Sequence, residues 1–392
     1  MLIWNSSHAR IGFFAAALLA PSFVSPLGAQ VTALDPASSV KVDLQPDSPV
    51  ALVSMSMGDS RASARGGATV LDLHMSLTLR NSGLRRVRGV TLLITTQEFA
   101  PGGKASVARP CIDVAPSQEF TVPVDVRLVR PVQQVAGGPL VRVQLDGVLF
   151  DDLSFFGPNK LNSQRAMTFW ETEAQRDRAY FKQVLRASGE RGLQSEILLS
   201  LAKQSEHGQL DVALSRNGRS VGSVVSSASQ HVAQFAFLKM PDAPVQPVQG
   251  WAEISGNEAR SPEIEVLNKS SKPVRYVEIG WMVRDTQGHD YLAGSVPASS
   301  TAMLLPPGQK SKLLPDTTLK FSKTGRPVEI QGMTGFVKQV EFADGKVWVP
   351  SREELKSSPL LRIMAPSPEE QRLADIYANK GIAALIAELN RY

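Results

Sequence analysis

The sequence is poor in the residue types on which many functional sites depend. Its 392 residues include one cysteine, Cys111, which excludes an internal disulfide framework, a CxxC redox pair and a zinc site made of cysteines. The five histidines are scattered and form neither an HExxH motif nor a pair four residues apart, so no metal site is predicted. Aromatic residues make up 6% of the chain, which is few for a surface that stacks on nucleic-acid bases.

The charge balance and the absence of phosphate-binding motifs exclude further functions. There are 42 Lys and Arg residues against 37 Asp and Glu, so the net charge of +5 comes from a small surplus rather than a dense basic tract. We therefore expect no nucleic-acid partner. No P-loop and no GxGxxG motif occurs, and no cofactor is predicted. The length predicts two or three domains at about 100–200 residues each.

Residues 1–29 have the pattern of a secretory signal peptide. Arg10 precedes an apolar run over 11–20, helix-breaking residues follow, and the small residue Ala29 stands at the predicted cleavage point. Ten apolar residues are too few to span a bilayer, which takes about 20. Cleavage at Ala29 and retention as an anchor both remain open. No later stretch is apolar enough to span, so we expect an exported chain, periplasmic or extracellular, without a transmembrane span after the signal.

The chain contains an internal repeat of domain length. Three blocks recur in the same order with small changes of spacing: 46–53 as 241–248, 77–81 as 264–268, and 150–158 as 342–350. The last block shares the pattern Phe-x-Asp-x-x-apolar-aromatic-x-Pro. A repeat this long predicts duplicated domains rather than a solenoid of short units.

Each copy of the repeat has the pattern of an antiparallel β-structure. Apolar residues alternate with polar or small ones from Leu71 to Leu79, as in a half-buried strand. Turns are predicted at Asn81-Ser82-Gly83 and at 268–271. Asp344-Gly345 predicts a two-residue hairpin turn with positive φ at both positions. Short strands without βαβ alternation favour a sandwich.

Helical segments are predicted after each copy. Residues 164–206 approximate a helical apolar stripe that Gly189 and Gly192 interrupt. Near the C-terminus, Ser367 is the predicted N-cap of a helix that Gly381 divides in two.

The two copies resemble the tandem Ig-like or fibronectin type III-like domains of bacterial exported proteins. The resemblance rests on the Asn turn after an alternating strand and on the terminal aromatic hairpin, and it implies adhesion, spacing or ligand display. The predicted fold class is mainly β with helical segments: two duplicated antiparallel Ig-like β-sandwich domains, each followed by short helices. The boundaries are 1–29 for the signal peptide, 30–45 for a linker, 46–163 for the first sandwich, 164–206 for a helical segment, 207–240 for a hairpin and linker, 241–350 for the second sandwich and 351–392 for a C-terminal helical segment.

Several catalytic-looking patterns have a simpler structural interpretation. Ser220 lies in a GxSxG pattern, but Asn217-Gly218 favours a hairpin there, and His231 follows too closely for the usual order of a hydrolase triad. His289-Asp290 is expected at a hairpin tip. Asp151-Asp152 lacks the spacing of a calcium loop and is predicted to form a turn. No catalytic residue is therefore assigned.

Two sets of residues are the candidate interaction surface. Arg85, Arg86 and Arg88 form the densest basic cluster, which could face an anionic glycan or membrane surface or simply be a solvated hairpin face. Phe155, Phe156 and Trp348 belong to the repeated hairpins, where packing between the last strands and the helices is the simpler interpretation.

The leading hypothesis is an exported, non-enzymatic protein that binds a protein or an envelope glycan or has a structural role. The alternatives are an exported serine or metal-dependent hydrolase, centred on Ser220 or on His289 and Asp290, and an envelope assembly or carrier factor. The sequence does not fix the partner or the oligomeric state.

Overall fold

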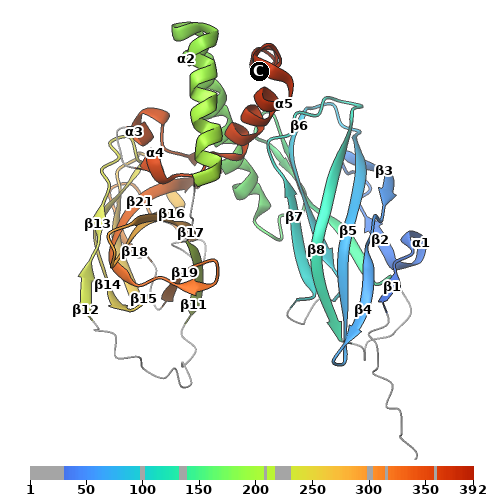
Figure 1. Cartoon of the computed structure of the whole chain (residues 1–392), viewed down its shortest axis with the longest axis horizontal. Helices are drawn as coiled ribbons and strands as arrows, with labels where there is room; N and C mark the ends of the chain where they lie inside the picture. The colour runs from blue at the N-terminus through green and yellow to red at the C-terminus, as the bar shows by residue number, and fades with distance from the viewer. Residues whose placement is uncertain are drawn as a thin grey trace, which may run out of the picture.

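The computed structural model describes residues 31–97, 102–131, 139–206, 210–216, 231–297, 303–313, 317–356 and 360–392. Within these ranges, two groups of strands lie on either side of the helices α2 (Ser163–Glu206) and α5 (Pro368–Asn390) (Figure 1). The predicted signal peptide and the predicted hairpin around Ser220 lie outside the described residues. None of the helices in these ranges is both long and apolar enough to cross a bilayer. The prediction of a mainly β chain with helical segments is confirmed.

The first group of strands forms two sheets. One sheet contains β1 (Val31–Ala33), β3 (Val50–Ser56), β4 (Arg61–Arg65), β5 (Ala68–Asn81) and β8 (Glu119–Pro131). The other contains β2 (Val40–Asp43), β6 (Val87–Thr95), β7 (Lys104–Arg109), β9 (Val141–Phe150) and β10 (Phe155–Phe156). The pairing is antiparallel except between β2 and β9, which run parallel. A single helical turn, α1 (Pro36–Ser39), lies between β1 and β2.

These two sheets pack face to face around one apolar core. The alternating residues of β5 point into it as predicted, and Leu71, Leu73, Leu77 and Leu79 have no exposed surface. They share the core with residues of β6 and β9 from the other sheet, such as Ile94. Period-two alternation therefore buries one face of β5 against the opposite sheet.

The second group of strands also forms two sheets. One contains β11 (Asp211–Arg216), β12 (His231–Gln234), β14 (Val245–Ser255), β15 (Glu258–Asn268), β18 (Lys310–Leu313), β19 (Thr317–Lys323) and β20 (Arg326–Pro327). The other contains β13 (Ala236–Phe237), β16 (Val274–Asp285), β17 (Asp290–Pro297), β21 (Ile330–Phe342) and β22 (Val347–Trp348). Only β13 and β21 run parallel among these named strands, and the short helices α3 (Arg352–Lys356) and α4 (Leu360–Ile363) follow β22.

An indole lies at the centre of the second core. Trp281 of β16 is fully buried, and its ring meets that of Phe235 edge to face with 4.8 Å between centroids. Gly335 of β21 lies beside it, because a Cβ there would come within 2.8 Å of Phe237 and 3.3 Å of Trp281. The absence of a side chain at this position lets the two aromatic rings pack against the backbone of β21.

The two predicted Asn turns share three side-chain hydrogen bonds. Asn81 and Asn268, each fully buried, end the long strands β5 and β15. The amide of Asn81 donates to the carbonyls of Arg85 and Val114, at 2.8 and 3.1 Å. That of Asn268 donates to two corresponding carbonyls, each at 2.9 Å. In both turns the Oδ1 accepts the N–H two residues further on.

The irregularities of the strands recur as well. The pairing of β3 with β5 shifts between Leu52 and Ser54, and that of β14 with β15 shifts at the corresponding place, between Pro247 and Gln249. The shifts in β6, which follow Val87 and Thr91, have counterparts in β16. A β-bulge bends its strand locally. The two groups of strands therefore bend at corresponding positions, in addition to having corresponding turns.

The helical segments are interrupted at Gly189 and Gly381 as predicted, whereas Gly192, also predicted to interrupt the first segment, lies within helix α2. Gly189 divides α2 with φ 65° and ψ −166°, and Gly381 divides α5 with φ 80° and ψ 179°. Residues before and after each glycine share one apolar core, with Phe181 and Leu193 from α2 beside Leu373 and Leu385 from α5. Each glycine therefore turns its helix back on itself, and the two helical hairpins pack together. Ser367 caps α5 as predicted, since its side chain accepts the N–H of Glu370.

The hairpin at Asp344-Gly345 differs from the prediction. The strands β21 and β22 do pair, but Gly345 alone has positive φ, at 81°. The N–H of Phe342 donates to the carbonyl of Lys346, so three residues, 343–345, lie between this pair instead of the predicted two. The side chain of Asp344 accepts the N–H of Lys346 and thereby stabilises the longer turn.

Candidate functional site

The predicted arginine cluster is engaged in ion pairs. Arg86 binds Asp113 through two hydrogen bonds of 2.9 and 2.8 Å, and Arg88 approaches the same carboxylate to 2.8 Å. Arg85 lies 3.3 Å from Asp152, with its guanidinium 3.9 Å from the centroid of the Phe150 ring. Burial alone would raise the pKa of the Asp113 carboxyl, but hydrogen bonds from Arg86 and the nearby positive charges lower it below its usual range. Much of the positive charge is thus neutralised locally, and a role in binding anions stays a prediction.

The aromatic residues of the repeated hairpins are half-buried. Phe155 and Phe156 pair with the end of β9, and the ring of Phe155 fills the space beside Gly147, where a Cβ would come within 2.2 Å of it. Trp348 pairs with Val340 of β21, and its strand β22 lies against α2. These positions fit the predicted packing between the last strands and the helices. Their role as an interaction surface stays a prediction.

Charged residues are buried where the helices meet the first group of strands. Arg178 forms ion pairs with Glu171 and, at 3.4 Å, with Glu369. The ring of Tyr392 lies 4.1 Å from the guanidinium of Arg178 and 4.7 Å from that of Arg88. Burial raises the pKa of the Glu171 carboxyl, despite the attraction of its arginines. An unpaired charge buried here would destabilise the folded state. The network therefore holds the C-terminus against β6 in one arrangement.

A second set of ion pairs lies on the opposite side of the helices. Arg352 of α3 binds Glu370 through two hydrogen bonds of 3.1 Å, and Asp177 accepts the hydroxyl of Ser367 at 2.6 Å. Asp177 also pairs with Arg176 at 2.9 Å. These contacts fix α3 and the start of α5 on α2.

The other candidate residues do not assemble a site. Cys111 is buried, and burial raises the pKa of its thiol. His289 contacts Asp285 at 3.3 Å, and Asp290 pairs with Arg284 at 2.8 Å, all within one hairpin. In the part of the chain that the structure describes, no three His, Cys, Asp or Glu side chains are grouped to hold a metal ion. His231 lies in β12, whereas Ser220 is outside the described residues.

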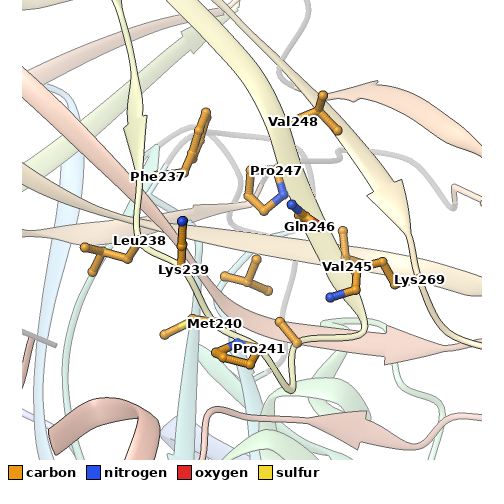
Figure 2. A pocket seen from close by; sticks show the side chains of 12 residues that line it. Phe237, Leu238, Lys239, Met240, Pro241, Val245, Gln246, Pro247, Val248 and Lys269 are labelled. Atoms are coloured by element: carbon orange, nitrogen blue, oxygen red, sulfur yellow. The ribbon is translucent and has the colours of Figure 1, made fainter. Parts of the chain in front are cut away.

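A cavity of about 350 Å³ opens beside β14 in the second group of strands. Its lining is mostly apolar and comes from the end of β13 and the segment after it, the start of β14, Lys269 after β15 and Val337 of β21 (Figure 2). Val337, Val245 and Ala243 are buried at its base, while Lys239, Gln246 and Val248 are exposed. The volume falls in the range of about 300–1,000 Å³ that is typical of ligand pockets.

The chain forms this cavity by moving from one sheet to the other. Strand β12 pairs with β14 up to Trp251, and the N–H of Phe235 donates to the carbonyl of Gly250. The next residues join β21, where the N–H of Leu238 donates to Gly335. The first half of β14 is thus paired with β15 on one side and has no strand on the other side among the described residues. The cavity therefore lies beside the first half of β14, where the segment after Phe235 has left this sheet to pair with β21.

The turn that closes the cavity is held at both ends. The N–H of Asp242 donates to Glu354 of α3 at 3.0 Å, and the N–H of Ala243 donates to the carbonyl of Met240. Where β14 begins, the carbonyl of Pro244 accepts the N–H of Lys269 at 2.8 Å. The lining is therefore preformed. In the sequence the segment 241–248 is recognisable only as a repeat block, because the cavity needs residues that are far apart in the chain.

Comparisons with known proteins do not identify this site. No family model and no curated protein matches the chain. Among solved structures, a red sea bream transglutaminase shows 7% identity and a TM-score of 0.12 over 74% of this chain, which spans 31% of the transglutaminase. A two-domain protein of unknown function from Bacteroides fragilis shows 6% identity and a TM-score of 0.10, covering 80% of this chain and 96% of that protein. At such scores neither similarity supports a fold or an activity.

Proposed function

We propose that this chain is an exported, non-enzymatic protein-binding module made of two copies of an Ig-like β-sandwich, each followed by a helical hairpin. The duplication is supported by the matching Asn turns at Asn81 and Asn268 and by the matching bulges in β3 and β14. In both copies the chain also begins with a strand in one sheet and continues with a parallel strand in the other sheet. These strands are β1 and β2 in the first copy and β12 and β13 in the second. Export rests on the signal-peptide pattern of residues 1–29.

The observation that carries the binding role is the cavity beside the open half of β14. It combines apolar walls, a strand edge that no other described strand pairs with, and exposed Lys239 and Lys269 at its rim. Loops and edges on a rigid scaffold are common places for recognition. The paired helical hairpins and their buried ion pairs supply that scaffold by fixing the two sandwiches to each other.

Site-specific photo-cross-linking tests this proposal. A photo-reactive amino acid replaces Val248, which lines the cavity and is 43% exposed, and in a second variant it replaces Leu84, which is 96% exposed beside the arginine cluster. Each variant of the exported chain is irradiated in envelope extract of its own source. We expect one protein to be captured from position 248 and not from position 84.

Two other outcomes contradict the proposed site. Capture from position 84 alone would move the interface to Arg85, Arg86 and Arg88. Capture of glycan from either position, with no protein, would replace protein binding by binding of an envelope polymer.

A further inference from the structure

Two positions at the rim of the cavity beside β14 differ in charge from the corresponding positions of the first sandwich. Lys269 follows Asn268 as Ser82 follows Asn81, and the N–H groups of Lys269 and Ser82 donate to the carbonyls of Pro244 and Pro49. The two positions are therefore equivalent in the backbone, but only the second copy has a cation there.

The second lysine of the rim is also specific to the second copy. Phe237 pairs with Gly335 in the same parallel arrangement in which Val42 pairs with Val143. Two residues further on, the second copy has Lys239 where the first has Leu44. The framework of the two copies is shared, whereas both rim lysines belong to one copy.

These two lysines have no partner of opposite charge within the described part of the chain. Lys239 and Lys269 are exposed and form no ion pair with described residues, and no Asp or Glu lines the cavity. The arginines of the first copy differ in this respect, because Asp113 and Asp152 already neutralise them. A rim of unpaired cations favours an anionic ligand.

The walls and the strand edge favour a polypeptide over another anion. Phe237, Leu238 and Met240 offer apolar surface, and among the described residues no strand pairs with the main chain of β14 before Gly250 on the side of the cavity. An extended peptide satisfies such an edge with its own N–H and C=O groups and places alternate side chains toward the pocket. Pro247 has no N–H, so the addition is confined to a short stretch instead of a whole strand.

We infer that the cavity binds a short, extended acidic segment of a partner protein, which lies along the first half of β14. One apolar side chain of the segment enters the cavity between Phe237 and Pro247 (Figure 2). Its carboxylates lie at the rim, near Lys239 and Lys269. This inference rests on the proposed protein-binding function and names the chemistry of the partner.

A peptide array tests the inference directly. The complete exported chain is applied to short peptides in which acidic, basic and neutral sequences are equally represented, beside galacturonate oligosaccharides as the glycan probe. We expect binding to peptides that combine Asp or Glu with an apolar residue. The double variant Lys239→Glu/Lys269→Glu should weaken the affinity for the best peptide by about tenfold and flatten its dependence on salt. Gln246→Trp, which places an indole on the cavity wall, should abolish binding.

A matched control separates local from general charge effects. Lys104→Glu changes an exposed lysine of β7 that forms no ion pair with described residues, and it should leave the affinity unchanged. Circular dichroism and the melting temperature show that each variant is folded.

The outcomes distinguish the inference from the function on which it rests. Binding of basic or neutral peptides, or acidic binding that survives the double lysine variant, overturns the inference. Binding of galacturonate without peptide binding does the same and names a glycan instead. If a protein is cross-linked at position 248 but no peptide of the array binds, the inference of an acidic segment is refuted and the proposed function is kept. If no protein is cross-linked and no peptide binds, the proposed function is refuted as well.

Discussion

Replacing the buried asparagine of either turn by alanine should destabilise the protein by about 3 kcal/mol. In the native state Asn268 satisfies the carbonyls of Lys272 and Leu305 and the N–H of Ser270. Asn268→Ala leaves all three groups without that partner, and a net hydrogen bond is worth about 1 kcal/mol, more where the orphaned group is buried. The same arithmetic applies to Asn81→Ala, since Asn81 makes three corresponding bonds.

Urea unfolding measures this loss. Tryptophan fluorescence, to which the fully buried Trp281 contributes together with Trp170, Trp251 and Trp348, and circular dichroism both follow the unfolding. Asn379→Ala is the matched control, because Asn379 donates one exposed hydrogen bond, to the carbonyl of Asp375 at 2.9 Å, and should cost at most about 0.5 kcal/mol.

Aspartate at the same positions separates the donor role from side-chain volume. Asn268→Asp keeps an acceptor for Ser270 but cannot donate to the two carbonyls, so it should cost at least as much as alanine. Losses below about 1 kcal/mol for both alanine variants, similar to the control, would refute the claim that these turns hold the framework of the two copies.

Three further predictions concern the helices, the thiol and the acid limit of stability. Gly189→Ala and Gly381→Ala force a side chain into a positive-φ conformation and should cost about 1–3 kcal/mol in urea unfolding, whereas Gly332→Ala, with open space and no positive φ, should be near neutral. Cys111 should react with a thiol reagent at pH 8 only after unfolding, because it is buried and its thiol pKa is raised; rapid labelling of the native chain would contradict its burial. The lowered pKa of Asp113 means that its ionised form adds stability above its ordinary pKa near 4, and that this stability disappears as the pH falls through the lowered value. Asp113→Asn should therefore remove part of the acid-induced loss of stability, and an unchanged acid profile would show that the Arg86 and Arg88 pairs contribute nothing.

Local patterns of the sequence predicted the elements that depend on neighbouring residues. The alternation from Leu71 to Leu79 identified β5, because period-two burial is visible without knowing the opposite sheet. Gly189, Gly381 and the cap at Ser367 were identified for the same reason, since helix interruption and capping act within one turn. At Asp344-Gly345 a local signal was wrong in detail, because the Asp344 side chain stabilises a longer loop.

The features that depend on distant residues were not predicted. The parallel pairing of β2 with β9 brings together segments that are far apart in the chain and carry no local mark. The ion pairs of the arginine cluster required Asp113, whose position beside Arg86 follows only from the fold. The cavity depends on Phe237 and Val337 lying beside β14. The two lysines at its rim are distinctive only by comparison with Ser82 and Leu44, which have the same places in the first copy.

Hydrogen–deuterium exchange of the complete chain shows whether a peptide pairs with the open half of β14. The exchange of residues 245–250, in the open half of β14, is compared with that of 50–56 in β3, the same edge in the first copy, with and without the best acidic peptide. Because an added strand protects the amides that it pairs, we expect slower exchange over 245–250 and no change over 50–56. Protection of 50–56 instead, or of neither edge at a saturating peptide concentration, would contradict this pairing.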